Sequence, residues 1–468
     1  MIELIRASFQ YENSDRGVRD ISLSVKSGEC VVLTGLSGCG KTTVTRLVNG
    51  LAPSYYPGAF SGIVKIDGKD ISRLSTWEIG RLVGSVFQDP KSQFFSSELA
   101  GEVAFPCENY GLSTREIRER TDAAIEALKL SHLKDRAVDV LSSGEKQRAA
   151  IASVYAMKPK VFVCDEPTAN LDAAGTRQLA QTLRQLKAQG FTLLLAEHRI
   201  DWLMGIADRF LYLRDGRIAA EYTPEDLLLL PEADILGMGL RSPHEGKSLS
   251  APSVLDESPA VLKTAGLSKK ICKEVIFDDV SLSFPKGKVT AITGQNGAGK
   301  TTLAQILCGL TRQTRGHILI DGKKARAAVR HREIYYCGND TSTQFFTASV
   351  AEELLLNTRL TEESKNRARI LLKELGLYEY RDAHPSALSG GQKQRLAIAC
   401  AIFSGRRILI LDEPTSGLDG QNMRLIAERL KSEARNGRTI LVITHDRELI
   451  ESCCDNIVEV GTKPGEVQ

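Results

Sequence analysis

The stretch that decides the fold of this chain reads Gly35-Leu36-Ser37-Gly38-Cys39-Gly40-Lys41-Thr42. An apolar run, residues 30–34, leads into it, and a run typical of a helix, residues 43–51, follows it. A strand, a glycine-rich turn and a helix in this order form the phosphate-binding loop, whose backbone N–H groups and helix N-terminus face an anion. The alternative is a chance glycine turn. That alternative does not explain why the pattern recurs at Gly294-Gln295-Asn296-Gly297-Ala298-Gly299-Lys300-Thr301.

Each loop supplies a lysine and a hydroxyl to the bound phosphates. Lys41 is predicted to reach the β- and γ-phosphates, and the Thr42 hydroxyl to ligate Mg²⁺. Lys300 and Thr301 repeat this pair in the second loop. The predicted nucleotide-binding residues of the loops are Gly35, Ser37, Gly38, Gly40, Lys41, Thr42 and Thr43, then Gly294, Asn296, Gly297, Gly299, Lys300, Thr301 and Thr302.

The composition narrows the class of protein. A length of 468 residues suggests two or three domains, and a net charge of +3 argues against a dedicated nucleic-acid binder. The 10 cysteines are scattered without a Cys-x-x-Cys pair, which indicates free thiols in a reducing compartment. Cys39 lies in the phosphate loop, where it is either a small side chain that only fills space or an oxidation-sensitive thiol. The first residues do not read as a signal peptide, and no apolar run approaches the ~20 residues that span a bilayer.

An internal repeat sets the domain organisation. Lys41 and Lys300 lie 259 positions apart, whereas the later pairs Gly144–Gly391, Asp165–Asp412 and His198–His445 each lie 247 apart. The first half therefore carries 12 additional residues before Gly144, part of them in a loop at residues 53–58. We predict a first domain at 1–240, a linker rich in Ser, Pro and Gly at 241–259, and a second domain at 260–468.

Within the first domain, residues 1–29 and 63–68 alternate as antiparallel strands do, and residues 113–135 show the spacing of amphipathic helices. The continuous apolar runs 161–164 and 192–196 suit parallel strands that are buried on both faces.

Two adjacent acids end a buried strand in each half. Asp165-Glu166 follows residues 161–164, and Asp412-Glu413 follows residues 408–411. Ligands gather beyond the carboxyl ends of a parallel sheet, so Asp165 is predicted to hold Mg²⁺ and Glu166 to act on the attacking water as base or polariser. A capping acid at a strand end is the alternative. It is disfavoured because both pairs stand in the same register after a phosphate loop.

A second anion-binding element precedes a helical run in each half. The first reads Leu141-Ser142-Ser143-Gly144-Glu145 and the second reads Leu388-Ser389-Gly390-Gly391-Gln392. Taken alone, either could be an ordinary helix cap.

The motifs of this chain, taken in their order along the sequence, resemble those of the ATP-binding-cassette (ABC) ATPases. They comprise a phosphate loop, a glutamine at Gln88, the signature motif, the Asp-Glu strand, the turn at residues 171–172 and a switch histidine at His198. The resemblance covers nearly the whole chain twice, and the signature stands intact at residues 388–392. It implies an α/β fold of two tandem P-loop NTPase domains of ABC type. Each would combine a mixed sheet core, an antiparallel β subdomain and a helical subdomain.

The resemblance also implies that the halves pair head to tail and enclose two ATP molecules with Mg²⁺. Glu166, His198, Glu413 and His445 would be catalytic, and Tyr11 would stack on adenine. The metal ligands would be Thr42, Gln88 and Asp165 at site one, then Thr301 and Asp412 at site two. The opposite half would contribute Ser389, Gly390, Gly391 and Gln392 to site one, and Ser142 and Gly144 to site two.

The two sites differ in sequence. Asn339 stands where Gln88 stands in the first half, and the region that matches Tyr11 offers no aromatic residue. The first signature carries Ser143 and Glu145 in place of Gly and Gln. We therefore expect both sites to hydrolyse ATP, with site two the weaker.

The stretch Gln88-Asp89-Pro90-Lys91-Ser92-Gln93-Phe94-Phe95 resembles ATPases of energy-coupling-factor importers for vitamins and metal ions. In those importers this region receives helices of a transmembrane scaffold protein. We expect one of Phe94 and Phe95 to be buried and the other to be exposed for docking. The resemblance implies scaffold and substrate-binding membrane subunits as partners, a place on the cytoplasmic side of the cell membrane, and no nucleic acid.

The competing interpretation is a soluble tandem cassette protein that acts on ribosomes or nucleic acid. Proteins of that class usually insert long charged helices, whereas the linker here is short and the charge is nearly balanced. A phosphotransferase outside the cassette family would leave the signature motifs without a role.

Overall fold

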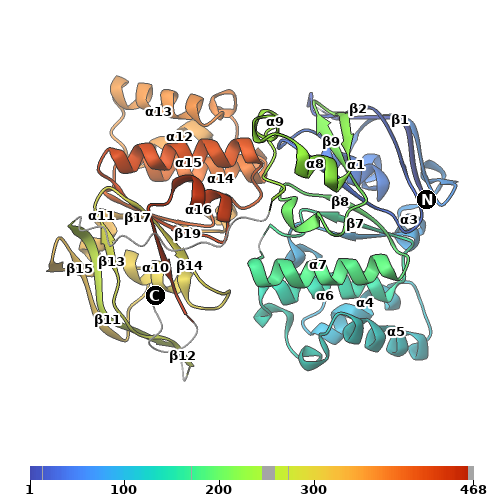
Figure 1. The fold of residues 1–468 in the computed structure, drawn as a ribbon, viewed down its shortest axis with the longest axis horizontal. Coiled ribbons are helices and arrows are strands. Elements are labelled where there is room, and N and C mark those ends of the chain that lie inside the picture. Colours follow the sequence, from blue (N-terminus) through green and yellow to red (C-terminus); the bar gives the residue numbers. More distant parts are fainter. Residues whose placement is uncertain (13, 170, 245–258, 272–273, 462–468) are drawn as a thin grey trace. The chain divides into compact units, whose positions relative to one another are not determined.

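The computed structural model describes residues 1–461 except 13, 170, 245–258 and 272–273 (Figure 1). The chain forms two compact units, one mainly of residues 1–244 and one mainly of residues 259–461. Most of the predicted linker lies outside the described residues, so the domain limits at 240 and 260 stay a prediction. Among the described residues, no helix combines the length and the apolar content that crossing a membrane requires.

The first unit begins with an antiparallel sheet of strand order β2-β1-β4-β5. Alternate side chains of β1, among them Ile2, Leu4 and Phe9, are buried, as expected of a strand with one face on a core. Its strands are β1 (Ile2–Tyr11), β2 (Gly17–Val25), β4 (Gly58–Ile66) and β5 (Lys69–Asp70).

The second sheet of this unit has the order β10-β9-β3-β8-β7-β6 and is parallel except for the β9–β10 hairpin. The predicted parallel strands β7 and β8 lie side by side in it, with β8 next to β3 and β7 next to the edge strand β6. The strands are β3 (Cys30–Gly35), β6 (Val83–Val86), β7 (Val161–Asp165), β8 (Thr192–Ala196), β9 (Arg209–Arg214) and β10 (Arg217–Tyr222).

Alternate residues of these strands enter two different cores. Val31 and Leu33 of β3 pack with helix α1 (Lys41–Val48), whereas Val32 packs with helix α6 (Ser143–Ala156). The helices that begin at the phosphate loop and at the signature therefore cover opposite faces of one sheet (Figure 1). The other helices are α2 (Leu51–Ser54), α3 (Thr76–Leu82), α4 (Leu99–Asn109), α5 (Thr114–Ala127), α7 (Ala173–Ala188), α8 (Pro224–Leu229) and α9 (Glu232–Gly237).

The second unit repeats this plan. Its antiparallel strands are β11 (Ala260–Ile271), β12 (Glu274–Val280), β13 (Ser283–Pro285), β15 (Arg315–Ile320) and β16 (Lys323–Lys324). Its parallel sheet has the order β17-β18-β19-β14-β20 and contains β14 (Val289–Thr293), β17 (Ile334–Cys337), β18 (Ile408–Asp412), β19 (Thr439–Ile443) and β20 (Asn456–Glu459). Its helices are α10 (Lys300–Cys308), α11 (Ala327–Glu333), α12 (Val350–Leu355), α13 (Glu362–Glu374), α14 (Gly390–Phe403), α15 (Gly420–Arg435) and α16 (Arg447–Cys453).

Three predicted local elements are corrected. Helix α1 ends at Val48 rather than at residue 51, because Gly50 adopts a left-handed conformation. The helical region 113–135 contains one α-helix that ends at Ala127, since the left-handed Lys129 breaks it. The loop predicted at 53–58 begins inside helix α2 and ends at the first residue of β4.

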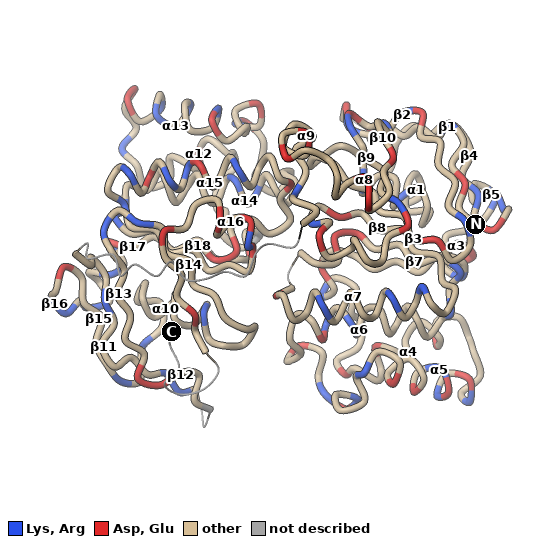
Figure 2. The backbone as a smooth tube through the Cα atoms, in the orientation of Figure 1, with Lys and Arg blue, Asp and Glu red and all other residues tan. Residues whose placement is uncertain are grey.

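Figure 2 shows that lysines and arginines alternate with aspartates and glutamates along helices such as α5 and α13. Both signs of charge therefore share these solvent faces, which is typical of exposed amphipathic helices.

Candidate nucleotide sites

The two phosphate loops hold their lysines in the same way. Lys41 Nζ donates to the carbonyl oxygens of Gly35 (3.0 Å) and Leu36 (3.2 Å). Lys300 Nζ donates to the carbonyls of Gly294 (2.6 Å) and Gln295 (2.9 Å). Each ammonium group thus lies inside the curl of its own loop. The predicted glycines and Ser37 or Asn296 form the turn, while Thr43 and Thr302 lie in the first turn of α1 and α10.

The last glycine of each loop has to be glycine. Gly40 (φ 108°) caps α1 and Gly299 (φ 89°) caps α10, both with left-handed backbone that side chains disfavour. A Cβ at Gly40 would lie 2.5 Å from the Val18 side chain, and one at Gly299 would lie 2.6 Å from Ile276. The loop therefore needs these glycines both for its curl and for its packing on the antiparallel sheet.

A hydroxyl and a carboxylate meet at each predicted metal position. Thr42 Oγ1 donates to Asp165 Oδ1 (3.2 Å), and Thr301 Oγ1 donates to Asp412 Oδ2 (2.8 Å). Mg²⁺ prefers hard oxygen ligands, few of them from protein, together with substrate phosphates. Within the described ranges, no cluster of three or more His, Cys, Asp or Glu side chains could hold a metal by itself. The residues present therefore fit Mg²⁺ bound jointly with phosphate.

Sequence reasoning missed one partner of the second aspartate. The Tyr336 hydroxyl donates to Asp412 Oδ2 over 3.1 Å, and only its place at the end of the adjacent strand β17 could have suggested this contact.

The first catalytic candidate, Glu166, contacts two other residues that were predicted to belong to site one. Its carboxylate lies 2.9 Å from Gln88 Nε2 and 3.2 Å from His198 Nε2. Glu166 follows β7 with a left-handed φ of 46°, a strained backbone that is usually found where function requires it. The structure therefore brings together three residues that lie far apart in the sequence.

The second catalytic candidate, Glu413, has a similar backbone (φ 50°) but different partners. Thr444 Oγ1 donates to its carboxylate over 3.2 Å, whereas His445 Nε2 lies 3.8 Å away. Asn339 lies in the segment that follows β17, at the position of Gln88. The polar shell of the second acid thus differs from that of the first.

Burial raises the pKa of most of these acids. Desolvation and the Glu166 carboxylate raise the pKa of Asp165 to about 6, and desolvation with Asp412 raises that of Glu413 to about 7. Burial also raises the pKa of Asp412. Glu166 is the exception, because the adjacent His198 ring outweighs its desolvation and lowers its pKa. At neutral pH, Glu166 is accordingly the better ionised of the two candidate bases.

The signature residues lie at helix N-termini. Ser142 caps α6 and Ser389 caps α14, and Gly144 and the set Gly390, Gly391 and Gln392 lie in the first turns. In each unit this helix covers the sheet face opposite to the phosphate-loop helix, as the separate cores show. No unit therefore packs its signature helix against its own phosphate-loop helix.

Tyr11 lies at the end of β1 beside the phosphate-loop helix. Its hydroxyl is 3.2 Å from Thr43 Oγ1 and accepts a hydrogen bond from Arg46 (2.9 Å). The Arg46 guanidinium lies 3.8 Å from the centre of the Tyr56 ring, and the Tyr56 and Tyr11 rings pack edge to face. Sequence reasoning missed Arg46 and Tyr56, because the contact depends on the additional segment after α1.

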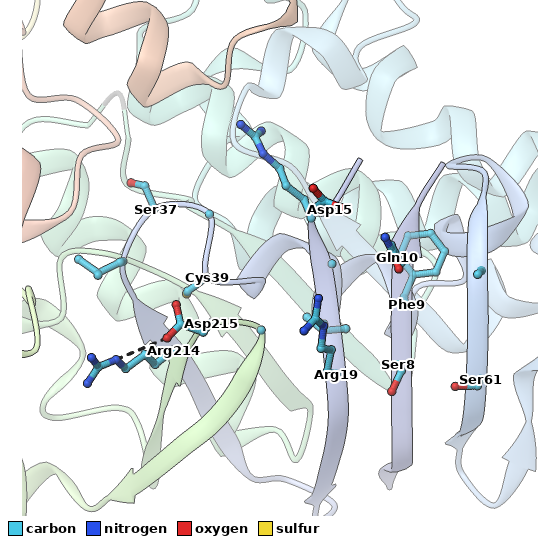
Figure 3. A pocket seen from close by; sticks show the side chains of 17 residues that line it. Ser8, Phe9, Gln10, Asp15, Arg19, Ser37, Cys39, Ser61, Arg214 and Asp215 are labelled. Atoms are coloured by element: carbon cyan, nitrogen blue, oxygen red, sulfur yellow. Dashed lines mark ion pairs between the residues drawn. The ribbon is translucent and has the colours of Figure 1, made fainter. Parts of the chain in front are cut away.

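A cavity of about 700 Å³ adjoins the first phosphate loop (Figure 3). Ser37 and Cys39 of the loop form one side, and Ser8 and Gln10 of β1 form another. Asp15, Arg16, Arg19, Arg214 and Asp215 add charges to its lining, and Arg214 pairs with Asp215 at 3.7 Å. Tyr11 is not among the residues that line this cavity, and no sequence pattern predicted the cavity.

This geometry defines a nucleotide-binding ATPase with two phosphate loops, each followed by a strand that ends in paired acids and by a histidine near the second acid. The sequence profile described as "ABC transporter" matches residues 18–169 and 277–416. The chain belongs to the ABC transporter family, and it binds and hydrolyses ATP.

Related proteins are similar over nearly the full chain. A Treponema denticola protein named as an ABC transporter ATP-binding protein is 40% identical, with 98% of this chain and 95% of that protein covered. YkoD of Bacillus subtilis, whose name assigns it to HMP/thiamine import, is 33% identical, with 98% and 89% covered. A chain in a structure titled as ribosome-bound archaeal Pelota and ABCE1 has a TM-score of 0.71 at 23% identity, covering 97% of this chain and 76% of that chain. At that identity the likeness shows the tandem fold alone.

We predict that Tyr11→Ala weakens ATP binding at site one about ten-fold, because stacking on one base contributes ~1–3 kcal/mol. The measurement is equilibrium binding in a chain whose second loop carries Lys300→Ala. Inorganic tripolyphosphate, which has no base, should bind unchanged, and Tyr11→Phe should retain most ATP affinity. An equal loss for tripolyphosphate would show that Tyr11 supports the loop rather than the base.

We also predict that Glu166→Gln removes a larger share of steady-state ATP turnover than Glu413→Gln. A positioned general base contributes roughly 10²–10⁴-fold at its own site, and Glu166 has both the lower pKa and the closer partners. Phosphate release would be measured for the two variants side by side, with melting temperatures as the folding control. A larger loss for Glu413→Gln would reverse the ranking.

Proposed function

We propose that this chain is the ATP-hydrolysing subunit of a membrane importer of the energy-coupling-factor type, with a vitamin, a metal ion or another small nutrient as cargo. Membership of the ABC transporter family and the full-length similarity to YkoD, which is named for HMP/thiamine import, support this proposal. The chain would act from the cytoplasmic side of the membrane with scaffold and substrate-binding subunits.

We further propose that the two halves pair head to tail around two ATP molecules. Ser142 and Lys41 belong to helices on opposite faces of one sheet, and so do Ser389 and Lys300. A signature serine therefore needs a phosphate loop from the other half. On this proposal Ser389, Gly390, Gly391 and Gln392 serve the first loop, and Ser142 and Gly144 serve the second.

Each residue of site one then has a task. Lys41 and the loop N–H groups neutralise phosphate charge, Thr42 and Asp165 would hold Mg²⁺, and Glu166 orients and deprotonates water. Mg²⁺ would supply charge neutralisation between the phosphates. Closure depends on the terminal phosphate joining donors of both halves, so its removal favours opening, and this two-state change would drive transport.

The observation that carries the transport proposal is an exposed aromatic residue at matched positions of both halves. Phe95 is 74% exposed and Phe346 is 80% exposed, whereas Phe94 and Phe345 pack against the cores. Phe94 and Phe345 are half-buried rather than buried as expected of one phenylalanine, and the second phenylalanine of each pair is exposed. Large exposed aromatic side chains are typical of protein-docking surfaces.

Both exposed phenylalanines are fixed by a buried carboxylate. Glu102, 2% exposed, accepts hydrogen bonds from the backbone N–H groups of Phe95 (2.8 Å) and Ser96 (2.9 Å). Glu353, 6% exposed, accepts from those of Phe346 (2.8 Å) and Thr347 (2.9 Å). A buried carboxylate that holds a loop in this manner gives the exposed ring a defined place, which favours a preformed docking site.

A second aromatic side chain adjoins Phe95, and an apolar residue occupies the matched sequence position in the second half. Phe105 stacks on Phe95 with ring centres 4.8 Å apart, and the matched Leu356 of the second half is 44% exposed. An apolar face of this kind suits the side of an amphipathic helix.

We expect Phe95→Ala/Phe346→Ala to release the protein from membranes that contain its partner subunits, because both rings lose their apolar contact. The measurement is sedimentation with membranes from cells that produce this chain and the neighbouring membrane proteins, followed by identification of what co-purifies. Leu229→Ala is the matched control, since Leu229 is 83% exposed but lies on α8. Melting temperatures should be unchanged in all variants.

The ribosomal alternative is an outcome of the same experiment. Sedimentation of the wild-type chain with ribosomes instead of membranes, unaffected by the phenylalanine substitutions, would replace the transport proposal with that alternative.

The altered first signature predicts a weakened site two. Glu145 accepts hydrogen bonds from both the backbone N–H and the hydroxyl of Ser142, each at 2.7 Å, and these bonds outweigh burial and lower its pKa. In the second half the neutral Gln392 accepts from the backbone N–H of Ser389 at 2.9 Å. A charged carboxylate beside a serine that should face phosphate repels the anion.

We therefore expect Glu145→Gln to raise ATP affinity and turnover at site two several-fold. The measurement uses a Glu166→Gln background, in which site two contributes most of the remaining activity. The same substitution in a Glu413→Gln background should change little. A gain confined to the second background would contradict the head-to-tail assignment.

A further inference from the structure

A threonine after each acid pair is held by a buried carboxylate. Thr168 Oγ1 donates to Glu197 Oε2 over 2.8 Å, and Thr415 Oγ1 donates to Asp446 Oδ2 over 2.6 Å. All four side chains are less than a tenth exposed. Because buried hydroxyls and carboxylates must find partners, this link is a structural requirement of both halves.

The two carboxylates come from different positions in the repeat. Glu197 immediately precedes the switch histidine His198, whereas Asp446 immediately follows His445. Thr444 occupies the position that matches Glu197, and Arg199 occupies the position that matches Asp446. The acid has thus exchanged sides of the histidine between the halves, while its bond to the threonine is retained.

In the first unit the acid also holds the histidine backbone. Glu197 Oε1 accepts hydrogen bonds from the N–H groups of His198 (2.9 Å) and Arg199 (3.3 Å), while Oε2 binds Thr168. Thr168 lies two residues after Glu166. One carboxylate therefore ties the backbone of the switch histidine to the segment that carries the candidate base.

In the second unit the equivalent link runs to a helix. Asp446 caps α16 by accepting from the Leu449 N–H (3.2 Å), and its own N–H donates to Thr444 Oγ1 (3.0 Å). The Thr444 hydroxyl in turn donates to Glu413 (3.2 Å). The distance between the histidine Nε2 and the glutamate carboxylate is 3.8 Å here, against 3.2 Å in the first unit.

We propose that Glu197 is a positioning residue of site one and sets the contact between His198 and Glu166. It hydrogen bonds the backbone of His198 and also Thr168, which lies in the segment that carries Glu166. In site two the pair Thr444 and Asp446 replaces it. This inference rests on the roles proposed above for Glu166 and His198. Glu197 itself is buried and acts through these residues.

The exchange of positions supplies a sharp test. Glu197→Thr removes the carboxylate and leaves the Thr168 hydroxyl and two N–H groups without their acceptor. Adding Arg199→Asp restores a carboxylate at the position that Asp446 uses in the second unit. Glu197→Gln keeps the shape, because its amide oxygen can accept from the backbone and its NH₂ group can donate to Thr168.

We expect Glu197→Thr, in a Glu413→Gln background, to lower kcat about ten-fold with little change in KM, since small displacements of catalytic groups reduce turnover while the phosphate loop is untouched. Glu197→Thr/Arg199→Asp should recover most of the loss, and Glu197→Gln should retain most of the activity. In a Glu166→Gln background the same substitutions should leave the residual site-two turnover unchanged.

Three outcomes would overturn the proposal. The first is unchanged turnover in Glu197→Thr. The second is a turnover in Glu197→Thr/Arg199→Asp as low as in Glu197→Thr alone. The third is a turnover in Glu197→Gln as low as in Glu197→Thr, which would indicate that the charge of Glu197 acts directly. If Glu197→Thr does not fold, the double variant decides, since restored folding and turnover are required of it. If Glu166→Gln alone leaves turnover intact, the role proposed for Glu166 is wrong. Because that result comes from a different variant, it is distinguishable from a failure of the role proposed for Glu197.

Discussion

Parallel pairing of three strands places the phosphate loop, the acid pair and the histidine of site one at one edge of a sheet. In the first unit β8 lies between β3 and β7, with Ala196 in register with both Leu33 and Asp165. The phosphate loop leaves β3 at Gly35, and the segment with His198 leaves β8. Because parallel strands end at the same edge, the loop, the acid pair and the histidine must meet there although they are up to 163 positions apart in sequence. The second unit repeats the arrangement with β14, β18 and β19.

On the head-to-tail proposal, the same sheet explains why the signature of each half would serve the phosphate loop of the other. Strands buried on both faces need a layer of helices on each face, and the chain assigns the phosphate-loop helix to one layer and the signature helix to the other. The polar contacts around the acids are free to differ once these layers are fixed. Glu166 accepts from an amide and an imidazole, whereas Glu413 accepts from a hydroxyl. The fold is thus shared between the halves, while the hydrogen bonding that tunes each base is not.

The sequence was sufficient for those features that follow from local pattern and repetition. Both phosphate loops, both acid pairs and the parallel strands were predicted, because each is a contiguous run found twice. The individual side-chain contacts of Thr168 and Tyr336 with distant segments were not predicted. Thr168 bonds Glu197 across 29 positions and Tyr336 bonds Asp412 across 76, and neither distance leaves a periodic signal. Local backbone detail was not predicted either, as with Lys129, whose left-handed conformation follows the end of α5 inside the region 113–135 that was predicted as amphipathic helices.

One short segment joins the chemistry of site one to the proposed docking surface. Gln88, at its start, contacts Glu166, and Phe95, at its end, is exposed. Between them Gln93 accepts from the Phe87 N–H (2.8 Å) and donates to the Ser85 carbonyl (3.0 Å), which braces the segment against β6. In the second half Gln344 donates only within its own loop, to the carbonyls of Gly338 and Asp340, among the side-chain bonds that the described residues make. On the proposed function, the two bonds of Gln93 would let a displacement of Gln88 reach Phe95, whereas Gln344 makes no matching pair of bonds in the described part of the second half. On this argument the first half is the better coupled of the two, which agrees with its closer catalytic contacts.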